Sequence, residues 1–129
     1  MKKGDKIAFS CFVNESIYNG FIDIFNDNNP LHTNFEYAVS KGFKGKVMHG
    51  NILNGFLSYF IGERLPNKDV IIHSQQISFG NPVYLNDKLD FEAEVEEVYD
   101  SVKVIKFKFY FKNGEGKNVA KGNIQIGLT

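Results

Sequence analysis

Strict alternation of apolar and polar residues marks the C-terminal half of the chain. Residues 89–96 alternate apolar side chains with Asp and Glu, and residues 105–112 alternate them mostly with Lys. A period of two predicts strands that bury one face. If the two runs pair as an antiparallel hairpin that turns near residues 99–101, an acidic row opposes a basic row. Each pair of opposite charges would then contribute about 0.2–1 kcal/mol.

Three further segments are expected to complete one antiparallel sheet. Residues 6–13 and 70–79 have strand-like apolar runs, and residues 124–128 carry the last strand. Asn113-Gly114 is a strong signal for a tight hairpin turn, because both residue types tolerate the positive φ that such turns need. The sequence therefore predicts one strand before the helical part of the chain and the remaining strands after it.

The residues that follow the first strand have a helical period instead. Asn14 is a good N-cap for this segment. One apolar stripe recurs at positions i, i+4, i+7 and i+8, formed by Ile17, Phe21, Ile24 and Phe25. Three Asx residues and a Pro predict a turn at residues 27–30, and residues 34–39 are expected to form another helical turn.

A second apolar helix is expected to begin at Gly50 and to end before Pro66. Its apolar residues recur at helical spacing over most of its circumference: Ile52, Leu53, Phe56, Leu57, Phe60 and Ile61. The positions between them include Gly55, Ser58 and Gly62, whose small size predicts the close approach of another segment. This helix is therefore expected to be wrapped on several sides.

These elements indicate an α+β fold with a single domain over residues 1–129. The strands need one buried face and the second helix needs burial on several sides. An antiparallel sheet curled around that central helix, a hotdog-like architecture, satisfies both requirements. One edge of such a sheet stays unpaired, and pairing with the edge of a second copy would cover it. We therefore expect a homodimer.

Composition narrows the function classes. The chain has 15 basic and 15 acidic residues, so it lacks the basic footprint of nucleic-acid-binding proteins. Cys11 is the only cysteine, which excludes an intrachain disulfide and a multi-cysteine zinc site. The first residues lack the features of a secretory signal, and no apolar run is long enough to span a membrane. A soluble, cytoplasmic protein without membrane or nucleic-acid partners is expected.

Residues 27–32, DNNPLH, begin a stretch with candidate chemistry. Taken alone, Asp27 suits a turn and His32 suits a structural hydrogen bond. Together with Asn34, Tyr37 and Ala38 they resemble the motif D-x-N-P-x-H-x-[DN]-x-x-[FY]-A of the (R)-specific enoyl-CoA hydratases in the MaoC-like hotdog family. The likeness continues at three later points, Met48-His49-Gly50, Gln76-Ile77-Ser78-Phe79 with Pro82-Val83, and Asp87-Lys88-Leu89.

The resemblance implies a reversible syn hydration of trans-2-enoyl-CoA to (R)-3-hydroxyacyl-CoA. It assigns Asp27 and His32 as the dyad that activates water, and the Gly50 N–H as the donor to the thioester oxygen. The residues expected to bind substrate are Asn29, His49, Asn51, Asn54 and Ser58. No metal and no cofactor are expected, because the thioester itself makes the α carbon acidic. CoA or an acyl carrier enters only as part of the substrate.

Some residues depart from the family pattern. Asn26 replaces the usual Gly before the acid, and Phe35 stands where Pro is common. Asn51 and Asn54 occupy helix positions that are commonly more apolar, so they bear on the acyl pocket. His49 fits either a pocket wall or a loop hydrogen bond. A rim of Lys41, Lys44 and Lys46 suits CoA phosphates, an acidic carrier protein or a solvated loop.

Other functions remain open at this point. The substrate could be linked to acyl carrier protein, which would make the enzyme a 3-hydroxyacyl-carrier-protein dehydratase, or the enzyme could be a dehydratase of a specialised pathway with polar acyl groups. A hotdog thioesterase would cleave the thioester instead, although the Asp-Asn-Pro-His pattern favours the hydratase branch. A non-catalytic acyl-thioester-binding protein could use the same fold.

Overall fold

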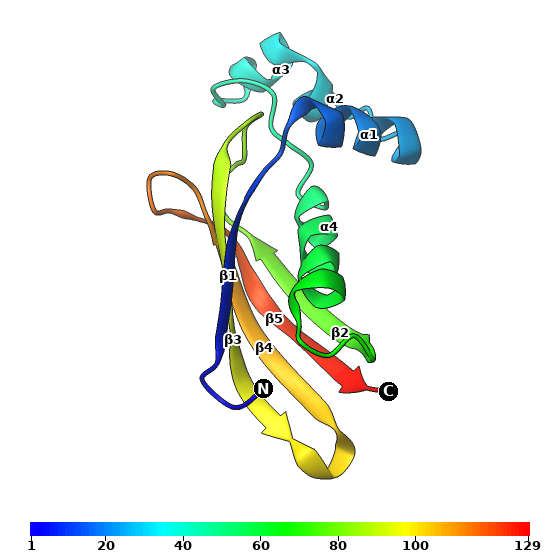
Figure 1. The fold of residues 1–129 in the computed structure, drawn as a ribbon. Coiled ribbons are helices and arrows are strands. Elements are labelled where there is room, and N and C mark those ends of the chain that lie inside the picture. Colours follow the sequence, from blue (N-terminus) through cyan, green and yellow to red (C-terminus); the bar gives the residue numbers. More distant parts are fainter.

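The computed structural model describes residues 1–129 as one antiparallel sheet with helices on one side (Figure 1). The strands are β1 (Lys6–Phe12), β2 (Val70–Phe79), β3 (Lys88–Tyr99), β4 (Val104–Lys112) and β5 (Asn118–Leu128). Their order across the sheet is β1-β3-β4-β5-β2. The predicted strands and their antiparallel pairing are confirmed, and the last strand begins earlier than the pattern suggested.

The β3–β4 hairpin has the predicted charge register. Glu94 lies opposite Lys108, with 2.9 Å between carboxylate and ammonium, and Asp90 lies opposite Lys112. The hydrogen bond from Lys108 lowers the pKa of Glu94. The connection is a short 3-10 helix, Asp100–Val102. Because this pair is largely exposed to water, it specifies register more than it contributes to stability.

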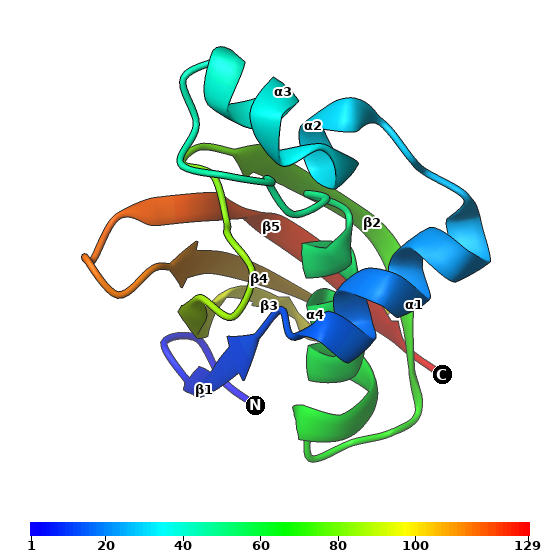
Figure 2. The ribbon, with the colours of Figure 1, turned by 90° about the horizontal axis from the view of Figure 1, so that it is seen from above.

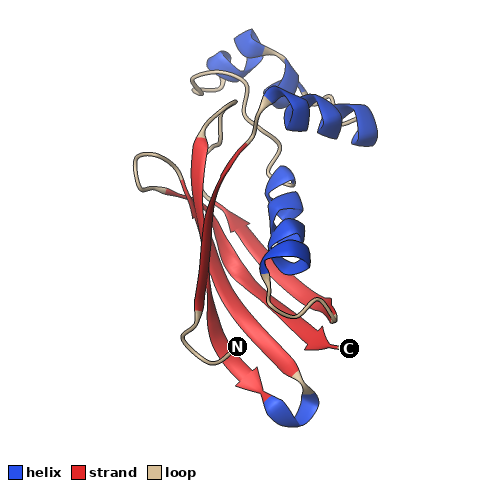
Figure 3. Ribbon diagram, viewed as in Figure 1, coloured by secondary structure: helices blue, strands red, loops and turns tan.

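Four α-helices lie between β1 and β2, namely α1 (Glu15–Phe25), α2 (Pro30–Thr33), α3 (Phe35–Ser40) and α4 (Ile52–Tyr59). The Asn14 side chain caps α1 by accepting a hydrogen bond of 2.9 Å from the Ile17 N–H. α4 continues as a π-helical turn, Phe60–Arg64. Helices α1 to α3 lie beyond one end of the sheet, while α4 packs on its concave face (Figure 3).

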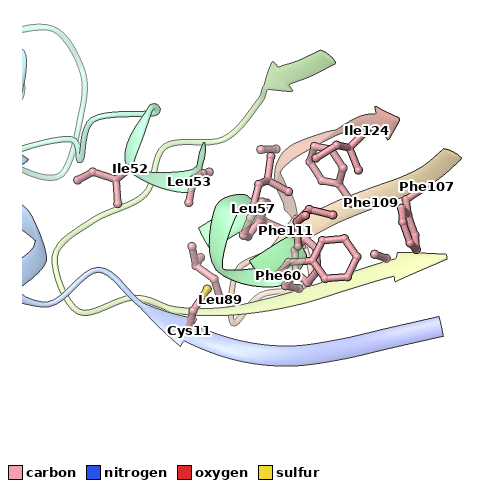
Figure 4. Packing of buried hydrophobic residues seen from close by; sticks show 14 of the residues in the cluster. Cys11, Ile52, Leu53, Leu57, Phe60, Leu89, Phe107, Phe109, Phe111 and Ile124 are labelled. Atoms are coloured by element: carbon pink, nitrogen blue, oxygen red, sulfur yellow. The ribbon is translucent and has the colours of Figure 1, made fainter. Parts of the chain in front are cut away.

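The core lies between α4 and the central strands (Figure 4). Six of its side chains are at most 2% exposed, Leu53, Leu57 and Phe60 from the helical side and Phe91, Phe107 and Phe111 from β3 and β4. Phe60 meets Phe107 edge to face with ring centroids 5.2 Å apart. The curled sheet therefore wraps one face of a central helix, and the predicted hotdog architecture is confirmed.

The outward face of α4 differs from the prediction. A Cβ built on Gly55 or on Gly62 meets no atom within 4 Å, and Ser58 is exposed. The expected close approach at the small positions is therefore wrong, because the sheet covers only the opposite face of the helix. Figure 2 shows α1 crossing near the start of α4 and leaving the rest of that face open.

Strand β2 forms one edge of the sheet and pairs only with β5. It carries exposed apolar side chains, with Ile71 54% and Phe79 51% exposed. This combination of unpaired backbone and apolar side chains is the kind of edge that proteins usually cover.

No helix is long and apolar enough to cross a membrane.

Candidate active site

A tight turn before α2 presents the acidic residue of the site. Asn26 ends α1 in the left-handed region, with φ of 57°, a conformation that Asn tolerates well. The Asp27 side chain accepts a hydrogen bond of 3.2 Å from the Asn29 N–H. Asn29 in turn caps α2 by accepting from the Leu31 N–H at 2.9 Å. Asn29 thus shapes the turn that holds Asp27.

His32 is oriented by main-chain groups. Its Nδ1–H donates to the Val47 carbonyl at 2.7 Å, which leaves Nε2 free to accept or deliver a proton. The Val47 N–H returns a hydrogen bond of 3.1 Å to the Leu31 carbonyl. The Tyr18 hydroxyl donates to the His32 carbonyl at 2.6 Å, and burial raises the pKa of Tyr18. Tyr18 therefore stays a protonated donor.

His49 completes a reciprocal pair of contacts. Its Nε2–H donates to the Asp27 carbonyl at 3.0 Å, and its ring stacks on His32 with centroids 4.0 Å apart. The contacts His32–Val47 and His49–Asp27 together form what we call the histidine clamp. Each imidazole holds the main chain of the segment that carries the other one.

The environment of His49 favours the neutral imidazole. Its side chain is buried at 3% exposure, and Nδ1 has no hydrogen-bond partner. Burial lowers the pKa of His49, and the nearby His32 lowers it further, against the opposing effects of the Asp27 carbonyl and carboxylate. A neutral His49 does not repel a proton on His32, so the dyad can exchange protons beside it.

The Asp27, His32 and His49 side chains lie close together. Their potential ligand atoms all lie within 4.8 Å of one another. Such a group suits a polarised water, with a carboxylate and an imidazole to take up its proton. The same donor set could hold a metal ion, and the absence of a metal stays a prediction. The structure thus brings the two residues of the predicted dyad together.

Gly50 lies two residues before α4, which begins at Ile52 and not at Gly50 as the sequence suggested. The Gly50 N–H makes no hydrogen bond within the chain. A Cβ at this position would lie 2.9 Å from the Phe79 ring. The glycine therefore leaves room for Phe79 against the backbone. An unobstructed N–H at a helix start can stabilise negative charge on an oxygen.

A cavity of about 360 Å³ opens beside these groups. His32, His49, Gly50 and Asn51 form part of its wall, and its apolar lining residues include Met48, Leu53, Phe79 and Val83. A mostly apolar hollow with a few convergent polar groups is typical of small-molecule sites.

The other residues that the sequence predicted for the site do not all lie together. Asn51 lines both this cavity and a groove between α1 and α4, while Asn54 and Asp27 line the groove alone. Ser58 is exposed on α4 and lines neither hollow. Asn29 also lines neither and acts on the turn.

Sequence reasoning missed three contributors to the site. They are the Val47 carbonyl, the Tyr18 hydroxyl and the Phe79 ring, which contact His32 or Gly50. Every residue has a main-chain carbonyl, so the sequence does not indicate which one contacts His32. Tyr18 has the pattern of a core residue on α1. Phe79 falls in the matched Q-I-S-F segment, which was the one available signal.

Comparisons with known proteins agree with this geometry. A family model described as "MaoC like domain" matches residues 5–115. An "(R)-specific enoyl-CoA hydratase" of Rhodospirillum rubrum is 30% identical over 108 residues, 84% of this chain and 75% of that protein. A "3-hydroxybutyryl-CoA dehydratase" of Methylorubrum extorquens is 33% identical over 79 residues, 61% of this chain and half of that protein.

A solved structure gives the same result for the fold. The "(R)-hydratase from A. caviae involved in PHA biosynthesis" superposes with a TM-score of 0.91 at 25% identity, over 100% of this chain and 98% of that one. The family match covers most of the chain and includes the turn, the clamp and the start of α4. The chain therefore belongs to the MaoC-like family.

Proposed function

We propose that this protein is a hydro-lyase that reversibly adds water to trans-2-enoyl-CoA to give (R)-3-hydroxyacyl-CoA. The convergence of Asp27, His32 and His49 within 4.8 Å, next to the Gly50 N–H, carries the proposal. Membership of a family of hydratases and dehydratases that act on acyl thioesters supports it.

The reaction needs three functions that these groups supply. Asp27 and His32 Nε2 orient one water and remove a proton from it as its oxygen bonds to the β carbon. The proton then reaches the α carbon, so one C–O bond and one C–H bond form while the C=C π bond is lost. Gly50 N–H donates to the thioester oxygen as it gains enolate character. Both additions come from the side of the dyad, which makes them syn.

The neutral state of His49 suits this step. Positioned acid–base catalysis contributes about 10²–10⁴-fold in rate, provided that His32 can both accept and release the proton. A second charged imidazole stacked at 4.0 Å would oppose protonation of His32. Burial of His49 removes that opposition.

Lysines near the cavity support a CoA-linked substrate. Lys44, Lys88 and Lys117 line one hollow that shares Asn81 and Pro82 with the cavity. Lys117 pairs with Glu115 at 3.4 Å. Asp87 also lines the hollow, so its three lysines exceed its carboxylates by one, and Lys44 and Lys88 are the candidates for phosphate contacts. A carrier-protein substrate is the alternative, and Lys44 would then face an acidic carrier surface.

The other two lysines of the predicted rim have aromatic partners. Lys41 lies 5.3 Å from the ring centroid of Tyr37, and Lys46 lies 5.6 Å from that of Tyr18. Cation–π contacts of this kind hold a side chain over a ring but leave its charge in place. We assign the phosphate contact to Lys44 and leave Lys41 and Lys46 to the loop.

We also propose a homodimer that forms through β2. This edge is longer than β1 and carries Ile71 and Phe79 in exposed positions. Light scattering should give twice the mass of 14.7 kDa, and a monomeric mass would refute the dimer.

A direct assay tests the activity. Crotonyl-CoA should lose the absorbance of its conjugated enoyl thioester when the protein is added, with (R)-3-hydroxybutyryl-CoA as product by chiral analysis. Release of free thiol instead would identify a thioesterase, and no reaction with any enoyl thioester would favour a binding protein. The same assay with crotonyl-carrier protein decides between the two carriers.

A further inference from the structure

The catalytic dyad lies between two different hollows. His32 lines the cavity, while Asp27 lines the groove between α1 and α4, and Asn51 belongs to both. The groove has a volume of about 830 Å³. One wall is apolar and comes from α1, with Ile17, Phe21, Ile24 and Phe25.

An acyl thioester likewise has two arms that meet at the reacting carbons. The pantetheine arm leads to phosphates and should run toward cations, and the cavity adjoins the hollow with Lys44 and Lys88. The groove contains no cation, and Asp27 is its only charged residue. Charge therefore directs the carrier arm through the cavity and leaves the groove, with its apolar wall, to the acyl arm.

The opposite wall of the groove carries a chain of amides. The Gln75 side-chain amide on β2 donates to Asn54 Oδ1 at 2.6 Å, and Asn54 Nδ2 donates to Asn51 Oδ1 at 2.9 Å. These contacts hold Asn51 and Asn54 on the open face of α4. The Asn51 Nδ2 group has no partner within the chain, so it remains a donor at the junction of the two hollows.

A wholly apolar acyl chain would bind weakly against this wall. It would remove water from amide groups without replacing the lost hydrogen bonds, and unpaired polar groups oppose binding. An oxygen on the acyl chain could accept a hydrogen bond from Asn51 Nδ2 or from the second N–H of Asn54 Nδ2. Because Asp27 is the only charge in the groove, an anionic oxygen group would be repelled.

We propose that the groove between α1 and α4 binds and selects the acyl chain, and that the substrate carries an uncharged hydroxyl or oxo group beyond its double bond. Asn51 and Asn54 are then the residues that determine specificity, with Gln75 as the residue that positions Asn54. This inference rests on the proposed hydratase activity and adds the chemical class of the acyl group.

Matched six-carbon substrates test the inference. We would compare kcat/KM for trans-2-hexenoyl-CoA with that for its analogues bearing a hydroxyl or oxo group at carbon 4, 5 or 6. At least one oxygenated substrate should be favoured about 5- to 10-fold, the effect of one net hydrogen bond. A matching dicarboxylic enoyl-CoA should be disfavoured against hexenoyl-CoA.

The variant Asn54→Leu, of similar volume, should reverse the ratio in favour of hexenoyl-CoA. Asn19→Leu makes the same exchange at an exposed position of α1 outside the groove, and it should keep the wild-type ratio. Asn54→Ala serves if the leucine variant does not fold, and it should bring the ratio close to one.

The outcomes separate the inference from the function it rests on. If crotonyl-CoA and hexenoyl-CoA are hydrated but no oxygenated analogue is favoured, the acyl assignment is wrong while the activity stands. An oxygen preference that survives in both Asn54 variants would also overturn it. If no enoyl thioester reacts, the proposed function itself fails.

Discussion

The phenylalanine-rich sheet and the segment from Asn26 to Asn51 hold their side chains in different ways. In β3 and β4, Phe91, Phe107 and Phe111 are at most 1% exposed and are held by packing against α4. In the segment, Asp27 and His32 are held by hydrogen bonds to a turn and to one carbonyl. Packing restrains the sheet side chains from many directions, whereas the positions of the Asp27 and His32 side chains depend on one hydrogen bond each.

This difference predicts where a substitution will act. Truncating a packed side chain leaves a cavity and lowers the stability of the whole domain. Removing a partly exposed titratable side chain leaves the core intact and removes chemistry. The two regions should therefore separate activity from stability, and the following variants test that separation.

The largest effect is expected at the dyad. Asp27→Ala and His32→Ala should each reduce kcat/KM on crotonyl-CoA by about 10²–10⁴, because each removes one acid–base group. The melting temperature should change by only a few degrees, since neither side chain is buried. Steady-state kinetics and calorimetry on the same preparations measure both. Near-normal activity in either variant would end the dyad assignment.

The core should behave in the opposite way. Phe107→Ala should lower the free energy of unfolding by about 3–5 kcal/mol, because its ring packs against Phe60 and is 1% exposed. The fraction that stays folded should keep its kcat. Phe12→Ala provides the control, since Phe12 is 48% exposed, and should cost about 1 kcal/mol or less. Urea unfolding of both variants makes the comparison.

Gly50 lies where the two regions meet. In Gly50→Ala, the new Cβ would displace the Phe79 ring, which lies 2.9 Å away from that position. Activity should fall by about 10–10², since the oxyanion donor shifts with the backbone. In the double variant with Phe79→Ala the methyl group has room, so part of the activity should return. An equal or greater loss in the double variant would place the defect elsewhere.

A smaller effect is expected from the pH dependence of the clamp. An unfolded His has a pKa of about 6.5, and burial lowers the pKa of His49 in the folded state. As pH falls below about 6.5 the unfolded state takes up the proton first, so stability is lost with falling pH until the folded-state pKa is reached.

Two variants of His49 separate its roles. His49→Gln removes the titration but keeps an amide that can donate to the Asp27 carbonyl, so its melting temperature should fall less between pH 7.5 and pH 5 than that of the wild type. It should also retain more activity than His49→Leu, which loses the contact. Equal pH profiles in wild type and His49→Gln would show that His49 does not titrate in this range.

The smallest effect is expected from metal removal. If Asp27, His32 and His49 act on water alone, dialysis against a chelator leaves kcat unchanged. Loss of activity that added Zn²⁺ restores would instead show that the three side chains hold a metal ion. Metal analysis of the purified protein provides an independent measurement.

The sequence alone determined much of the scaffold. Alternation over residues 89–96 and 105–112 predicted the β3–β4 hairpin and its charge rows, because burial of one face imposes a period of two. Asn14 marked a helix start through local backbone chemistry. Asn113-Gly114 marked the place of the β4–β5 turn, but the tight two-residue form was wrong: the loop spans residues 113–117, its positive φ lies at Gly116, and the Asn113 side chain holds it by accepting from the Glu115 and Lys117 N–H groups. The DNNPLH turn could be recognised for the same local reason, and it contains Asp27 and His32.

Only the tertiary structure decided how those two residues meet the rest of the site. His32 contacts a carbonyl 15 residues away, and His49 contacts one 22 residues away. Phe79 reaches Gly50 from β2, and Gln75 reaches Asn54 on α4 from the same strand. Such contacts depend on the path of the whole chain, which no local pattern encodes. The open face at Gly55, where the sequence predicted close packing, has the same cause: a helix pattern shows which positions are small, but not what lies opposite them.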